Sequence, residues 1–190
     1  TAIGVGGTFT CSFDAVLSGL AGDPDHVDIV TAVVDDGEGN TASDDGSATV
    51  SFGDELPSIG VAKTPSVGSV PETGGTVTFT VEVTNTSVEP INLTDLDDDV
   101  FGDLLDPANP AIGSNDCDDQ ATAIGVGGTY TCSFHAFLAG DAGGPDHSNT
   151  VTAVADDGEG NPATSFDSAS VSYLDELPSI SVAKTPSTGT

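Results

Sequence analysis

Carboxylates are the side chains with which this sequence could do most chemistry. The chain of 190 residues carries 31 Asp and Glu residues against two Lys residues, which gives a formal net charge of −29 at pH 7. Two lysines can neutralise few of these acids, so the remainder need water or external cations. Nucleic acid and anionic membranes are excluded as partners, because both bind to positively charged surfaces.

Clustered carboxylates suit calcium, which takes about six to eight oxygen ligands. We therefore expect Ca²⁺ as a candidate cofactor, and a cation at the repeated DEL segment would stiffen the joint between neighbouring units. The alternative is a solvated acidic surface in which the repeated DDGEGN segment is simply a turn. The segment TDLDDDVFG begins like an EF-hand loop but lacks its sixth-position Gly and its terminal Glu. The candidate ligands are Asp35, Asp36, Glu38, Asp54, Glu55, Asp95, Asp97, Asp99, Asp156, Asp157, Glu159, Asp175 and Glu176.

The two lysines could form a different kind of bond, an amide crosslink to an Asn or Asp side chain. Lys63 and Lys184 are the only cations of their units, each in a VAKTPS segment. An isopeptide bond of this kind requires a buried lysine, an amide or acid partner and an assisting carboxyl group. The sequence does not identify the partner, and the alternative is an exposed or salt-bridged lysine.

Other catalytic patterns are missing from the sequence. The three histidines, at positions 26, 135 and 147, have no metal-ligand spacing, and there is no GxSxG, P-loop or CxxC motif. We expect no enzymatic activity. Asn85 and Asn92 each begin an Asn-X-Thr/Ser triplet, which makes both candidate glycosylation sites.

An internal repeat organises the chain. Residues 1–69 match residues 122–190 without a gap, and TAIGVGGTFTCSFDA at the start returns as TAIGVGGTYTCSFHA. Self-similarity at a fixed period predicts an array of units of about 121 residues. We frame residues 57–177 as one complete unit, residues 1–56 as the C-terminal part of another, and residues 178–190 as the first strand of the next. Both ends then fall within a repeat, as expected of an excerpt from a longer chain.

The repeat also predicts how the three cysteines pair. Cys117 and Cys132 lie in one unit, and Cys11 is the copy of Cys132. We expect one disulfide per unit, between Cys117 and Cys132, with the partner of Cys11 lying outside the sequence. Closing such a loop stabilises by roughly 3 kcal/mol and implies an oxidising, extracellular compartment. The alternative is three buried free thiols.

The elements that must position these residues are short strands. In TVTFTVEVT (76–84) the side chains of Val77, Phe79, Val81 and Val83 alternate with polar ones, which indicates a half-buried strand. TYTCSFHAFL (129–138) alternates in the same way. Further strands are expected at 58–64, 91–96, 100–105, 150–156 and 169–175, with hairpin turns at Gly74, Gly127 and DDGEGN. This pattern favours an all-β, antiparallel Greek-key β-sandwich, with a barrel as the alternative.

The segments VAKTPS, TVTFTVEVTNTS, TVTAVADDGEGN and ASVSY together resemble the conserved surface-repeat domain of unknown function number eleven. The resemblance covers the whole unit. It implies tandem immunoglobulin-like sandwiches on bacterial or archaeal envelope proteins, and it implies no enzymatic activity.

The sequence therefore predicts a structural protein that forms an extracellular filament or a cell-surface stalk. Its expected partners are neighbouring repeats or copies of itself. The alternative is an adhesin or another ligand-binding surface module. No apolar run approaches the roughly 20 residues of a membrane span.

Overall fold

The computed structural model describes residues 1–109 and 111–187, which form strands and, among these residues, no helix. They separate into two compact units, Thr1–Asp54 and Glu55–Thr190, called unit 1 and unit 2 below. In the described residues there is consequently no helix of the length and apolarity that crossing a membrane requires. The chain is all-β, as the sequence predicts.

Unit 1 contains one antiparallel hairpin, made of β1 (His26–Asp35) and β2 (Thr41–Val50). Residues 1–25, all of which the structure describes, contain no strand. Apolar side chains on both faces of the hairpin, including Ile29, Val30 and Val33, are exposed. Unit 1 therefore has a two-stranded sheet without a second sheet to cover it.

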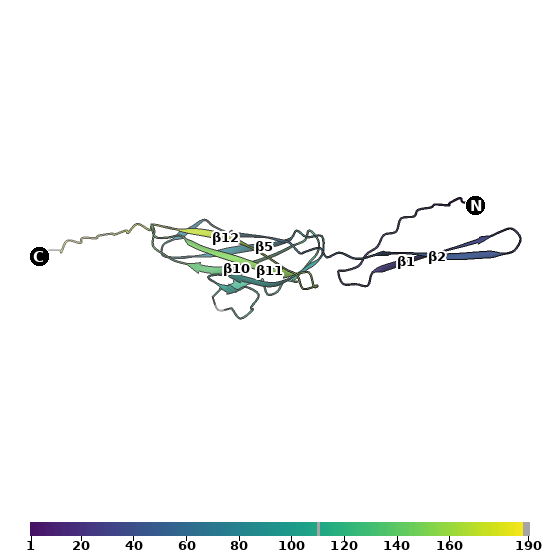
Figure 1. Cartoon of the computed structure of the whole chain (residues 1–190). Helices are drawn as coiled ribbons and strands as arrows, with labels where there is room; N and C mark the ends of the chain where they lie inside the picture. The colour runs from purple at the N-terminus through teal and green to yellow at the C-terminus, as the bar shows by residue number, and fades with distance from the viewer. Residues whose placement is uncertain (110, 188–190) are drawn as a thin grey trace. The chain divides into compact units, whose positions relative to one another are not determined.

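Unit 2 consists of two sheets that pack face to face (Figure 1). The first sheet has the order β3 (Ile59–Pro65), β5 (Gly75–Asn85), β10 (Thr129–Leu138) and β8 (Ser114–Asn115). The second has the order β4 (Ser69–Pro71), β12 (Pro162–Leu174), β11 (His147–Asp156), β6 (Ile91–Asp98) and β7 (Gly102–Asp103), with β9 (Ala123–Ile124) also on β6. Every pair is antiparallel except β12 with β4.

The core of unit 2 lies between the sheets, where the period of two predicts it. The four inward residues of β5 are fully buried, and so is Phe134 on β10. Phe79 stacks on Phe134 with 5.3 Å between ring centroids, and Phe101 packs edge-on against Phe134 at 5.5 Å. The five inward residues expected on β10 are all buried: Tyr130, Cys132, Phe134, Ala136 and Leu138. These aromatic rings lie among buried Val, Leu, Ile and Ala side chains, and burial of this apolar surface holds the sheets together.

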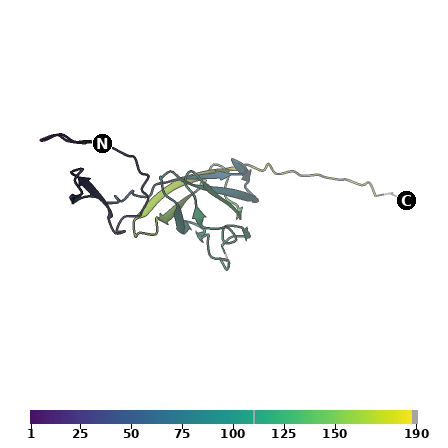
Figure 2. The ribbon, with the colours of Figure 1, turned by 90° about the vertical axis from the view of Figure 1, so that its right-hand side faces the viewer.

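The chain enters and leaves the two sheets of unit 2 at opposite ends. β3 begins beside the last residue of β5, because Ile59 pairs with Asn85. β12 ends beside the short β4, where Leu174 pairs with Pro71, and the turn at Gly74 leads from there into the start of β5. The two points are thus separated by the length of β5, roughly 35 Å for its 11 residues. Figure 2 shows the two units after a rotation of 90°.

The expected GGT turns differ from the prediction in one respect. Gly74 and Gly127 have φ of 109° and 67°, a left-handed backbone that favours glycine, so both are true turns. They do not close hairpins, however, because β4 and β5 lie in different sheets, as do β9 and β10. The sequence shows where the chain turns, but not which sheet each following strand joins. It also missed the short strands β4, β8 and β9, which are two or three residues long.

Candidate functional site: a buried lysine, aspartate and asparagine

Lys63 is buried inside unit 2, although lysine is almost never fully buried without a partner. It lies in β3, opposite Val81 of β5, and only 5% of its surface is exposed. Its backbone N–H donates to Asp167 Oδ2 at 2.8 Å, which holds β3 against the second sheet. Lys63, for which no partner could be identified from the sequence, therefore points into the core.

Asp98, the last residue of β6, is the charged partner of Lys63. Its Oδ2 forms a salt bridge with Lys63 Nζ, and both side chains are inaccessible to water. Its Oδ1 accepts the backbone N–H groups of Val100 and Phe101 at 3.0 and 3.1 Å. These three contacts hold the carboxyl group in one orientation.

Asn149 completes the buried group from β11. Its Nδ2 donates to the same Asp98 Oδ2 atom at 2.8 Å, and the residue is 1% exposed. Among the described residues, Asn149 Oδ1 finds no hydrogen-bond donor. The lysine amine and the asparagine amide therefore lie side by side on one carboxyl oxygen. Lys63, Asp98 and Asn149 are called the buried triad below.

The walls around the triad are aromatic. Lys63 Nζ lies 4.9 Å from the ring centroid of Phe79 and 5.7 Å from that of Phe134. Burial lowers the pKa of Lys63 below its usual range, while the hydrogen bond to Asp98 and the charges of Asp98, Asp99 and Asp167 oppose that shift. Burial also lowers the pKa of His147, and the nearby Lys63 charge adds to this effect. The amine thus sits in an environment that favours its neutral, nucleophilic form more than water does.

The sequence identified neither Asp98 nor Asn149 as a partner of Lys63. Asp98 belongs to an acidic run that looks solvated, but continuing the inward alternation of β6 beyond Leu96 places it in the core. Asn149 precedes the segment expected as a strand (150–156), yet the same period of two carries it inward with Val151 and Ala153. The alternation could thus have predicted that Asp98 and Asn149 are buried. It could not have predicted that they lie next to Lys63, because the three residues come from strands distant in the sequence.

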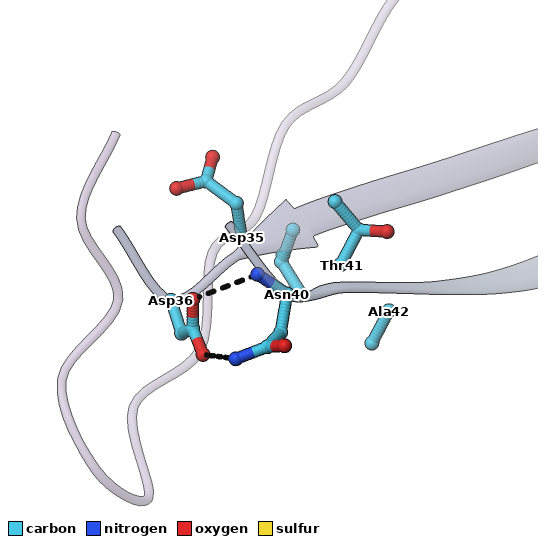
Figure 3. A pocket seen from close by; sticks show the side chains of 6 residues that line it. Asp35, Asp36, Asn40, Thr41 and Ala42 are labelled. Atoms are coloured by element: carbon cyan, nitrogen blue, oxygen red, sulfur yellow. Dashed lines mark hydrogen bonds between the residues drawn. The ribbon is translucent and has the colours of Figure 1, made fainter. Parts of the chain in front are cut away.

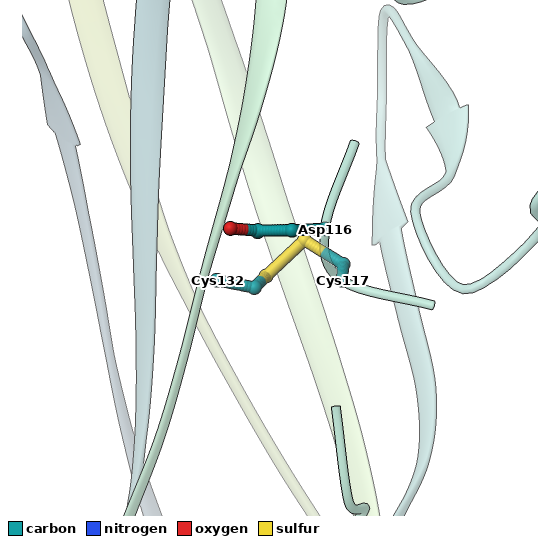
Figure 4. A group of neighbouring side chains, drawn as sticks. All are labelled: Asp116, Cys117 and Cys132. Atoms are coloured by element: carbon teal, nitrogen blue, oxygen red, sulfur yellow. A yellow bond between two sulfur atoms is a disulfide. The ribbon is translucent and has the colours of Figure 1, made fainter. Parts of the chain in front are cut away.

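The disulfide is formed as the sequence predicts. Cys117 and Cys132 are joined across 15 residues, and the bond attaches the loop after β8 to β10 (Figure 4). Tyr130 donates its hydroxyl hydrogen to the Cys117 carbonyl at 2.6 Å. Burial raises the pKa of Tyr130 to about 12, and the charges of Asp116 and Asp118 add to the shift. Because both sulfur atoms are in the disulfide, Asp116 beside them does not form a thiolate metal site.

Cys11 differs from its copy, Cys132. It is exposed and is a free cysteine among the described residues. Unit 1 contains no residue that corresponds to Cys117, the cysteine expected to pair with the Cys11 position.

The second aspartate of each DDGEGN segment holds its own turn. Asp36 accepts the backbone N–H of Glu38 at 2.8 Å. It also accepts the backbone N–H of Asn40 at 3.1 Å and the Asn40 side-chain amide at 2.6 Å (Figure 3). Those hydrogen bonds, the one from the Asn40 side chain foremost, lower the pKa of Asp36. Such bonding is typical of Asx turns and supports the interpretation of DDGEGN as a hairpin turn.

The copy in unit 2 repeats these contacts. Asp157 accepts the N–H of Glu159 at 2.8 Å, the N–H of Asn161 at 3.2 Å and the Asn161 side-chain amide at 2.8 Å. Burial opposes ionisation of Asp157, but the hydrogen bonds outweigh it and the pKa is lowered. The first aspartates, Asp35 and Asp156, each accept the N–H of the turn glycine at 3.0 Å.

The remaining candidate calcium ligands lie at two places. Asp95, Asp97 and Asp99 are exposed on β6 and the residue after it. Burial raises the pKa of Asp97, and the neighbouring charges of Asp95 and Asp103 add to this shift. The DEL acids Asp54, Glu55, Asp175 and Glu176 are exposed. Exposed acids of this kind are common without an ion, and calcium stays a prediction.

The two candidate glycosylation residues have different surroundings. Asn85 is buried, and its Nδ2 donates to the carbonyls of Glu89 and Ile124 at 2.7 and 3.1 Å. A glycan on this nitrogen would break those bonds and has no room in the core. Asn92, in contrast, is exposed on β6, so the folded unit favours Asn92 over Asn85.

No family model and no curated protein matches the chain. Its function therefore has to be argued from the geometry of these residues.

Proposed function

We propose that this chain is a segment of an extracellular structural array, a stalk or filament whose repeated unit is an immunoglobulin-like Greek-key sandwich. The observation that carries the proposal is that the chain enters and leaves unit 2 at opposite ends of β5. Units joined through such ends add their lengths. A unit with both ends on one side would add bulk instead.

Two further observations support the array. The hairpins of the two copies have the same register, with His26 opposite Val50 in one and His147 opposite Val171 in the other. The Cys117–Cys132 disulfide is compatible with an oxidising compartment outside the cell. The proposed partners are neighbouring repeats or further copies of the same chain. For the adhesin alternative, no specific observation in the described residues adds to what the sequence offered.

Chains made of one, two and four copies of residues 57–177 test the proposal. Their maximum dimension, measured by small-angle X-ray scattering and by electron microscopy, should rise by a constant increment per copy. That increment should be at least the roughly 35 Å of β5. A particle that grows equally in all directions, as a compact globule does, would contradict the proposal.

A further inference from the structure

The buried triad is difficult to explain as a stabilising ion pair. Removing two charges from water carries a large desolvation cost, and a well-packed apolar group often stabilises a core equally well. Lys63 and Asp98 are nevertheless buried together as an ion pair, in a core that is lined by aromatic rings. Asn149 adds a buried carbonyl oxygen without a donor among the described residues, which is a further penalty. The arrangement suits a reaction better than it suits a resting salt bridge.

We propose that Lys63 and Asn149 become covalently joined by an isopeptide bond between Lys63 Nζ and Asn149 Cγ, with Asp98 as the catalytic residue. The geometry that points to this reaction is the sharing of one oxygen atom. Asp98 Oδ2 contacts both the amine that would attack and the amide nitrogen that would leave. A single carboxyl group can then move a proton from one nitrogen to the other.

The reaction balances without an oxidant, a nucleotide or a metal. Asp98 first takes a proton from the Lys63 ammonium group, which leaves a neutral amine. The amine nitrogen attacks Asn149 Cγ, the Cγ–Nδ2 bond breaks, and Asp98 passes its proton to Nδ2. A hydrogen of the attacking nitrogen returns to Asp98. An amine and a carboxamide thus become a secondary amide and one ammonia, which leaves the core and takes up a proton in water.

The surroundings provide the conditions that this step needs. A desolvated lysine is a better nucleophile, and the walls formed by Phe79 and Phe134 desolvate Lys63. Folding brings the amine and the amide together from strands 86 residues apart (149 − 63), which replaces a bimolecular encounter by a local one. The two backbone N–H groups on Asp98 Oδ1 keep Oδ2 directed at both nitrogen atoms. The same exclusion of water protects the finished amide from hydrolysis.

The equivalent position of the other copy also carries a side chain with a γ-carbonyl group. Asn149 corresponds to Asp28, and both side chains offer a γ-carbonyl group to a lysine. With an aspartate the same bond would form with loss of water instead of ammonia. Substitution at this position has therefore kept the acyl group that an isopeptide bond requires.

The bond would have a mechanical consequence, which rests on the proposed function. Lys63 lies on the first strand of unit 2, in one sheet, and Asn149 lies on β11 in the other. A covalent link between them would prevent tension from extending the chain between residues 63 and 149. Within unit 2, only the residues before Lys63 and after Asn149 would then yield to force.

Intact mass spectrometry of the purified 190-residue chain tests the bond without any variant. After reduction of the disulfide, we expect a mass lower by one ammonia than the sequence requires, and a branched peptide that links Lys63 to Asn149 after proteolysis. A loss of one water with Lys63 linked to Asp98 would overturn the assignment of Asn149. A mass equal to that of the unmodified sequence would overturn the proposal altogether.

Three variants locate the chemistry. Lys63→Met and Asp98→Asn should each restore the full mass, and circular dichroism should show that the β-sheet content is kept. Asn149→Asp should give a product of the same final mass as the native chain, because it loses water where the native chain loses ammonia. Lys184→Met, which changes the copy of Lys63 in the exposed C-terminal segment, is the matched control and should keep the ammonia loss. Retention of the ammonia loss in Asp98→Asn would overturn the role of Asp98. A failed array in the scattering experiment would leave these masses unaffected, so the two proposals fail separately.

Discussion

Two segments with nearly the same sequence have different structures in this protein. TFTCSFDAVL (8–17) contains no strand, whereas TYTCSFHAFL (129–138) is β10, in the middle of a sheet. Phe13 is 73% exposed, while its copy Phe134 is fully buried at 0%. The difference lies in the neighbours, because β10 pairs along its length with β5 and unit 1 contains no counterpart of β5. Strand formation here depends on cross-strand partners more than on local preference.

The two hairpins, in contrast, form in both units. β1 with β2 and β11 with β12 have the same register over all ten pairs, although only the second hairpin has a core beneath it. The DDGEGN turn, held by the carboxyl group of Asp36 or Asp157, sets that register locally. Local sequence therefore suffices for the turn and its two strands. The remaining strands of the 121-residue repeat depend on the presence of residues 57–121.

The largest expected effect comes from the paired phenylalanines. Phe134→Ala should reduce the free energy of unfolding of unit 2 by about 3–5 kcal/mol, because it leaves a cavity beside Phe79 and Phe101. Phe13→Ala should change that free energy by less than about 0.5 kcal/mol, since the side chain is exposed. Chemical denaturation followed by circular dichroism measures both, and equal effects would break the comparison.

A smaller difference is expected for the cysteines. Cys132→Ser should destabilise unit 2 by about 3 kcal/mol, because it opens a loop of 15 residues. Cys11→Ser, at the copied position, should leave the midpoint of denaturation unchanged. Thiol titration should find one free thiol in the native chain, and finding three or none would contradict the assigned pairing.

The smallest effect concerns the turns and should be alike in the two units. Folding lowers the pKa of both Asp36 and Asp157 below 3.8, so each stabilises its hairpin above that pH. This contribution is lost as the pH falls through the lowered folded value, since protonation weakens the carboxylate as an acceptor. Carboxyl chemical shifts measured by NMR between pH 6 and pH 2 should show both midpoints below 3.8. A midpoint above 3.8 at Asp157 would contradict its contacts with Asn161.

The alternation of apolar residues was sufficient to predict the long strands and the core side of β5 and β10. The repeat was sufficient to predict the disulfide. Neither could predict the triad, because Lys63, Asp98 and Asn149 meet through the pairing of β3 with β5 and of β11 with β6, and strand order is not encoded in a period of two. The run of acidic residues around Asp98 suggested a solvent-exposed side chain, but Asp98 is buried while its neighbours are exposed.

Hydrogen exchange of residues 8–17 tests the central claim most directly. It should be measured in the native chain and in a chain to which a second copy of residues 57–121 is added before Thr1. We expect these amides to exchange rapidly in the native chain and to become as protected as those of β10 in the extended chain, with Cys11 oxidised by the added cysteine. Protection in the native chain, or rapid exchange in both chains, would contradict the claim that the front half of the repeat makes this segment a strand.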